Sequence, residues 1–99
     1  MSYDVTVGTQ EFNYTANMRA FFADFGVHPV RDMDGKSTTQ VLSNITDALK
    51  RFTELDMDVL CGDYDDPNGW GDVEGAIRFL FDIYLACLTE IDADTVEAI

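Results

Sequence analysis

The segment over residues 73–91 constrains the fold more than any other, because apolar side chains cover nearly every side of a helix drawn through it. A narrow polar strip at helical spacing interrupts them, formed by Gly75, Arg78, Asp82 and Thr89. Such a helix is either central to the fold or partly buried in an oligomer. Asp72 is expected to cap its start. Arg78 and Asp82 lie four residues apart, so we expect them to form an intrahelical ion pair or to lie on an interface.

A second helix is predicted to begin after Ser37, because Ser37 followed by Gln40 matches a capping box. Apolar residues then recur with the helical period of about 3.6 residues as far as Leu60, which indicates one long helix. These apolar residues are Val41, Leu42, Ile45, Ala48, Leu49, Phe52, Leu55, Val59 and Leu60.

The N-terminal residues predict a β-hairpin. Residues 3–7 alternate in the manner of a strand, residues 8–10 are able to turn, and residues 11–14 are able to return as a second strand. The acidic tail over residues 92–99 leaves three alternatives open. It frays, extends the preceding helix or adds a strand to the hairpin.

A short helix is expected after the hairpin, capped by Thr15 or Asn13 and ending at Gly26. Its apolar positions recur at helical spacing and are Met18, Phe21, Phe22 and Phe25. Two loops are expected further on, over residues 27–36 and 62–71, because both segments are rich in turn-forming residues.

The chain has 99 residues, of which 46% are hydrophobic, so it has apolar material for one core and too little length for two. We therefore expect residues 1–99 to form a single domain. The predicted fold class is α+β, a small and mainly helical domain of three helices with an N-terminal β-hairpin. Cys61 and Cys87 are expected to be free thiols.

Charge is distributed unevenly along the chain. Nineteen acidic residues against six basic ones give a formal net charge of −13, which argues against nucleic acid or an anionic membrane as a direct ligand. Residues 1–51 carry six acids and five bases, whereas residues 52–99 carry thirteen acids and a single base, Arg78. No signal peptide or membrane span is recognisable, so we expect a cytoplasmic location.

Carboxylates are densest between Glu54 and Glu74, and no base lies between Phe52 and Ile77. Such a run is usually a solvated surface, but rigid clustered carboxylates also imitate DNA, which displays about one charge per 1.7 Å of its axis. Trp70 lies in the same segment and either packs back onto the core, which we favour, or anchors a partner. The predicted partner-binding residues are Glu54, Asp56, Asp58, Asp63, Asp65, Asp66, Trp70, Asp72 and Glu74.

Catalytic and metal sites are not indicated. His28 is the only histidine and has no residue at a spacing typical of a catalytic triad, so a structural or solvated role is expected. Asp63, Asp65 and Glu74 fall at the first, third and twelfth places of a calcium-binding loop, but the fifth and sixth places do not fit. We therefore expect no enzymatic activity, no cofactor and no metal.

Two turn-rich motifs carry a resemblance to known proteins. They are Asn13-Tyr14-Thr15-x-Asn17 and Tyr64-Asp65-Asp66-Pro67-Asn68-Gly69-Trp70-Gly71. With them, and with the Asp34-Gly35-Lys36 turn, the chain resembles small uncharacterised proteins encoded by tailed bacteriophages over most of its length. The resemblance implies production in the cytoplasm of a bacterial host cell, and it implies no catalytic residue.

Three functional hypotheses follow. The first is a non-enzymatic DNA mimic that inhibits host defence, of the anti-CRISPR or anti-restriction type, by docking on a basic, nucleic-acid-binding host protein or complex. The second is a protein that sequesters a small ligand or signalling nucleotide in a pocket between the Asn13-Tyr14 strand and the Asn68-Gly69-Trp70 loop. The third is an accessory phage protein or antitoxin-like partner whose acidity only reflects solubility. A homo-oligomer is compatible with each.

Overall fold

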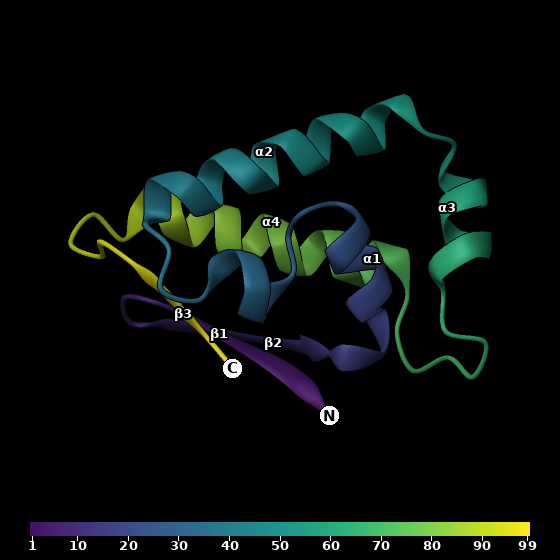
Figure 1. Cartoon of the computed structure of the whole chain (residues 1–99), viewed down its shortest axis with the longest axis horizontal. Coiled ribbons are helices and arrows are strands. Elements are labelled where there is room, and N and C mark those ends of the chain that lie inside the picture. Colours follow the sequence, from purple (N-terminus) through teal and green to yellow (C-terminus); the bar gives the residue numbers. More distant parts are fainter.

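A three-stranded antiparallel sheet forms one layer of the computed structural model, which describes all 99 residues (Figure 1). The strands are β1 (Ser2–Val7), β2 (Gln10–Thr15) and β3 (Val96–Ala98), in the order β2-β1-β3. β1 and β2 form the predicted hairpin, with Tyr3 opposite Tyr14. Of the three alternatives for the tail, pairing with the hairpin is the one found, because β3 pairs with the end of β1.

The helices form a second layer on one face of this sheet (Figure 1). They are α1 (Arg19–Asp24), α2 (Thr38–Glu54), α3 (Met57–Tyr64) and α4 (Val73–Thr89), with the single turns η1 (Ala16–Met18) and η2 (Pro29–Met33). Strand alternation explains the two layers, because Tyr3, Val5 and Val7 of β1 are buried under the helices while Asp4 is exposed. The α+β class is confirmed, but the prediction of three helices is wrong.

The helix predicted from Ser37 to Leu60 is in fact two helices. Ser37 caps α2 as expected, with its hydroxyl accepting a hydrogen bond from the Gln40 backbone N–H at 3.0 Å. The chain then breaks at Leu55, and the Asp56 carboxylate caps α3 through the backbone N–H groups of Asp58 and Val59. An acidic N-cap competes with continuation of the helix, and the apolar period alone does not reveal it.

Aromatic rings connect the two layers. Phe22 of α1 packs edge-on against Tyr3 of β1 and Tyr14 of β2, and against Phe79 of α4. Next to it, Phe21 contacts three further rings, those of Phe25, Phe52 and Tyr64. The predicted short helix with its buried phenylalanines is therefore confirmed, and its rings join the sheet to α2, α3 and α4 within one cluster of 24 buried residues.

α4 is capped by Asp72 as predicted, since the Asp72 carboxylate accepts a hydrogen bond from the Gly75 backbone N–H at 2.6 Å. One side of α4 packs on the sheet and α2, whereas the other side is exposed. The predicted ion pair between Arg78 and Asp82 is wrong, because the only ion pair of the chain joins Arg31 and Asp32. An exposed pair of this spacing stabilises a helix by only about 0.2–0.5 kcal/mol, too little to hold both side chains.

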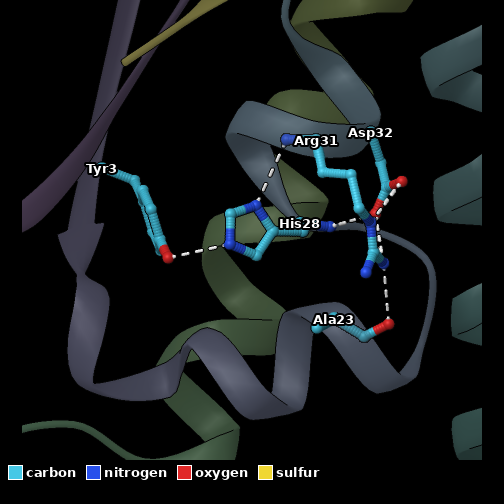
Figure 2. A network of polar contacts seen from close by, with 5 residues as sticks. All are labelled: Tyr3, Ala23, His28, Arg31 and Asp32. Carbon is cyan, nitrogen blue, oxygen red and sulfur yellow. Dashed lines mark hydrogen bonds and ion pairs between the residues drawn. The ribbon is translucent and has the colours of Figure 1, made fainter.

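His28 has a structural role, and the segment expected as a loop contains the single π-helical turn η2 (Figure 2). The His28 Nδ1 atom accepts a hydrogen bond from the Arg31 backbone N–H, and Nε2 lies 3.0 Å from the Tyr3 hydroxyl. Because Nδ1 accepts, the neutral ring carries its proton on Nε2 and donates it to Tyr3. The Arg31–Asp32 pair at 2.8 Å closes the network and reaches the carbonyl of Ala23.

Glu90 fastens the end of α4 to the hairpin turn. Its Oε1 atom accepts hydrogen bonds from the Thr9 hydroxyl at 2.7 Å and the Thr9 backbone N–H at 3.2 Å. These two bonds lower the pKa of Glu90 below its usual value. The contact is therefore strongest when Glu90 is ionised.

We expect the contribution of Glu90 to stability to disappear in acid. A carboxylate whose pKa is lowered by folding stabilises the protein above its unfolded pKa of about 4.3, and this stabilisation is lost as pH falls through the lower folded pKa. Urea unfolding of the wild-type protein and Glu90→Gln at several pH values measures the effect. The difference in unfolding free energy between them should be constant near neutrality and should shrink below about pH 4. A pH-independent difference would contradict the role assigned to the ionised side chain.

Candidate interaction site at the acidic end

The predicted partner-binding residues gather at one end of the molecule. α3 stands at the right-hand end of the long axis in Figure 1, and the loop over residues 65–72 returns from it to the start of α4. All nine predicted residues lie on the end of α2, in the break before α3, on α3, on this loop or on the first turn of α4, and each is exposed or half-buried. We call this region, from Glu54 to Glu74, the acidic end.

Four of the carboxylates hold the backbone of the acidic end and are called the bonded carboxylates: Asp56, Asp65, Asp66 and Asp72. Asp56 and Asp72 are the caps of α3 and α4. Asp65 accepts a hydrogen bond from the Val73 backbone N–H at 2.8 Å, and Asp66 accepts one from the Trp70 backbone N–H at 3.1 Å. These side chains satisfy donors that would otherwise be unpaired, so they shape the loop.

The other four carboxylates, called the unbonded carboxylates, are Glu54, Asp58, Asp63 and Glu74. All four are exposed, and none takes part in a side-chain hydrogen bond or an ion pair. Their charge is fully available to a partner. Arg51 is the nearest base along α2, and its guanidinium lies 4.6 Å from the centre of the Phe25 ring, not on a carboxylate.

Cys61 shows how closely the fold brings these charges together. The pKa of its thiol is raised, first by burial and then by the negative charges of Asp65, Glu74, Asp58 and Asp72. These carboxylates belong to α3, the loop and the start of α4, which the sequence separates by up to sixteen residues. The charges of all four therefore act on one thiol, although they come from different segments. Cys61 and the buried Cys87 are both free, as predicted.

Trp70 is exposed and rigidly presented. The residue is 70% exposed, so the favoured interpretation that it packs back onto the core is wrong. The backbone of Trp70 is held from two sides, by the Asp66 carboxylate and by the Asn17 amide, which donates to the Trp70 carbonyl at 3.3 Å. The flanking Gly69 and Gly71 have φ angles of 77° and 151°, which turn the chain so that the indole points outward.

Tyr14 ties the loop to the sheet. The Asp72 backbone N–H donates to the Tyr14 hydroxyl at 3.1 Å, and that hydroxyl donates in turn to the Asp72 carbonyl at 3.1 Å. Burial, and after it the nearby Asp72 carboxylate, raises the pKa of Tyr14 above its usual value, so the hydroxyl stays protonated. On α3, Tyr64 makes a similar link by donating to the Asp24 carboxylate of α1 at 2.7 Å.

The pocket proposed between β2 and the loop is not formed as expected. Asn13 turns toward Ser2 and Asp4 instead, with its amide 2.9 and 2.7 Å from their side chains. A groove of about 360 Å³ does lie beside β2, but its other wall belongs to α4. Its lining residues are Glu11, Phe12, Asn13, Tyr14, Gly75, Arg78, Phe79 and Asp82. Residues 68–70 take no part in it.

The calcium-type spacing at residues 63–74 does not become a ligand cage. Asp63 lies within α3, while Asp65 is bonded to the Val73 backbone. No group of three histidine, cysteine, aspartate or glutamate side chains is arranged to hold a metal ion.

A second acidic surface escaped the sequence analysis. Asp4, Glu11 and Glu97, one from each strand, line a hollow of about 470 Å³ on the open face of the sheet. The alternation of the hairpin strands could have indicated Asp4 and Glu11. Glu97 could not be placed, because its position depends on the pairing of β3 with β1.

Comparison with protein-family models, curated proteins and solved structures found no match. None of the helices combines the length and the apolar character that crossing a membrane requires.

The presentation of Trp70 is testable through its two glycines. A Cβ atom at Gly71 would meet the Thr15 side chain at 2.6 Å in addition to an unfavourable φ angle, whereas a Cβ atom at Gly69 would meet nothing within 4 Å. We expect Gly71→Ala to lower the unfolding free energy by roughly 2–3 kcal/mol and Gly69→Ala by about 1 kcal/mol. Urea unfolding measures both, and equal effects would contradict the close packing of the loop on Thr15.

Proposed function

We propose that this chain is a non-enzymatic interaction protein whose acidic end occupies the basic, nucleic-acid-binding surface of a host protein. In this role it acts as a DNA mimic in the bacterial cytoplasm, inhibiting a defence nuclease or CRISPR complex. The observation that carries the proposal is the set of four unbonded carboxylates at the same end of the molecule as an exposed Trp70, whose backbone is held by hydrogen bonds. An acidic surface that is only solvated does not require an exposed tryptophan on a braced loop.

Rigidity supports the proposal. A DNA mimic must hold its carboxylates in place before binding, because ordering flexible side chains costs free energy at the interface. At the acidic end, the bonded carboxylates and the links through Tyr14 and Tyr64 fix the backbone on which the unbonded carboxylates stand. The charges therefore need little rearrangement to meet a basic surface.

The electrostatics favour a basic protein as the partner. No ion pair neutralises the acidic end, so its field attracts cationic surfaces and repels nucleic acid. Attraction of this kind speeds association and weakens as salt screens it. Trp70 supplies the short-range contact that charge alone lacks, since tryptophan on a rigid loop is typical of binding hot spots.

We expect removal of the unbonded carboxylates to weaken capture of the partner strongly without unfolding the protein. The variant is Glu54→Gln, Asp58→Asn, Asp63→Asn and Glu74→Gln together. Tagged protein is used to retain proteins from a bacterial host lysate at low salt, and high salt elutes them for mass spectrometry. The proposal expects a nucleic-acid-binding protein that salt releases and that this variant binds roughly 10- to 100-fold more weakly.

The matched control removes four carboxylates elsewhere, by Glu11→Gln, Asp47→Asn, Asp94→Asn and Glu97→Gln. It has the same net charge as the first variant and none of its changes lies at the acidic end. It should retain the partner. Equal losses in both variants would show that net charge alone attracts the protein, and recovery of no nucleic-acid-binding protein would contradict the proposal.

Trp70→Ala is expected to weaken binding of the same partner by roughly 30-fold, the loss typical of a hot-spot residue. Its effect on stability should be small, because the indole is 70% exposed and makes no core contact. Titration of the wild-type protein with the captured partner, followed by Trp70 fluorescence, gives an independent measurement. An emission spectrum that does not shift on binding would place Trp70 outside the interface.

A second candidate function is the sequestering of a small anionic ligand in the groove beside β2. The observation in its favour is Arg78, which has no ion-pair partner and lines that groove together with Phe12 and Phe79. Glu11 and Asp82 line the same groove and oppose an anion. Mass spectrometry of small molecules released from the denatured protein tests this function. A ligand should be released from the wild-type protein and be absent from Arg78→Ala. If the wild type releases none, or if Arg78→Ala releases the same molecule, the function is excluded.

A further inference from the structure

The outer side of α4 is apolar and uncovered. Phe81, Leu85 and Leu88 are 45%, 42% and 51% exposed. Phe79 packs on Tyr14 of the sheet, and a residue advances about 100° around a helix, so Phe81 and Leu88 point away from the sheet. This side of α4 therefore forms the surface of the helical layer.

Tyr84 extends this surface toward α2. Its ring stacks on that of Phe81, with the ring centres 6.0 Å apart. It also lines a shallow hollow of about 230 Å³ with four residues of α2, namely Thr46, Leu49, Lys50 and Thr53. We call the surface formed by Phe81, Tyr84, Leu85 and Leu88 with these four residues the α4 face.

The α4 face holds one base, Lys50, and no acid. That composition is unusual in a chain with nineteen acidic residues and a net charge of −13. The acidic end and the open face of the sheet carry carboxylates on other sides of the molecule. A second copy of so acidic a chain meets the least repulsion where carboxylates are fewest, and the α4 face is such a place, with Glu74 and Asp82 only at its edges.

We propose that the α4 face binds a second copy of this chain, with the two α4 helices packed antiparallel about a two-fold axis near Tyr84 and Leu85. Phe81 of each copy then meets Leu88 of the other, and each helix presents the same apolar side. An isologous contact uses the same surface of both copies, and in this dimer that surface is the α4 face. This inference does not depend on the proposed function.

Charge favours the antiparallel arrangement. Arg78 precedes the apolar side chains and has no ion-pair partner within the chain. In the antiparallel dimer it lies beside the C-terminal end of the other α4, where the helix dipole is negative and Asp92 follows. The two acidic ends, each at the N-terminus of its α4, are separated by about the helix length, roughly 25 Å for 17 residues.

The area of the α4 face indicates a reversible dimer. Its partly exposed side chains offer on the order of 400 Å² per copy, about half of the roughly 800 Å² per partner of standard complexes, so the contact belongs to the weak, transient class. We therefore expect a monomer–dimer equilibrium in the micromolar range. Salt should strengthen the dimer, because the repulsion between two copies is screened. Added salt should instead weaken the complex with the basic partner of the proposed function.

Sedimentation velocity of the full chain over micromolar to near-millimolar concentrations tests the proposal. The wild-type mass should rise from 11.1 kDa toward twice that value, and further at higher salt. Leu85→Glu should remain monomeric at every concentration, with circular dichroism unchanged because the side chain is 42% exposed. Val59→Glu is the matched control, since it adds the same charge at a valine 59% exposed on α3, and it should dimerise like the wild type.

Three outcomes would overturn the inference. They are a wild type that stays monomeric throughout, a Leu85→Glu variant that dimerises normally, and a Val59→Glu variant that loses dimerisation. Charge reversal tests the arrangement of the helices. Arg78→Glu should weaken the dimer, and adding Asp92→Lys should restore it. If Leu85→Glu abolishes the dimer but Asp92→Lys does not restore dimerisation to Arg78→Glu, the antiparallel packing is contradicted.

Discussion

The packing of Phe21 and Phe22 against rings from every layer is the interaction on which the rest of the structure depends. Phe22 joins the hairpin to α4 through Tyr14 and Phe79, and Phe21 joins α1 to α2 and α3. Aromatic pairs of this kind contribute about 0.5–1.5 kcal/mol each beyond the burial of their area. The same aromatic cluster is tied to the acidic end, because Tyr14 bonds to Asp72 of that end, and Tyr64 of that end bonds to Asp24 of α1. The core therefore holds the charged end in place.

A chain with net charge −13 and one ion pair must resist its own repulsion by other means. Backbone N–H groups provide one of them, since Asp56, Asp65, Asp66 and Asp72 all accept hydrogen bonds from the main chain. Two of these acids also lie at helix N-termini, where the dipole stabilises negative charge. The acidic end thus contains acids that build the fold and acids that only display charge. This division makes it feasible to change the charge without unfolding the protein.

The molecule separates two kinds of surface. Carboxylates occupy the acidic end and the open face of the sheet, whereas the α4 face is apolar and free of acids. Salt has opposite effects on the two, because screening weakens attraction to a basic partner and relieves repulsion between copies. A dimer through the α4 face would leave both acidic ends exposed, at opposite ends of the assembly. The proposals on partner and dimer are therefore compatible but independent.

Local patterns in the sequence determined the hairpin, the short helix with its phenylalanines, both long helices at their capped starts and the grouping of acids in one segment. Each depends on residues close together in the chain, such as Ser37 with Gln40 or Asp72 with Gly75. The break at Leu55 was missed because Leu55 and Val59 continue the apolar period although both are exposed. Only the tertiary structure decided that the tail pairs with β1, that Trp70 points outward and that the α4 face lacks acids. These features depend on contacts between distant segments, such as Asn17 with Trp70 and β3 with β1, whose free energy no local pattern expresses.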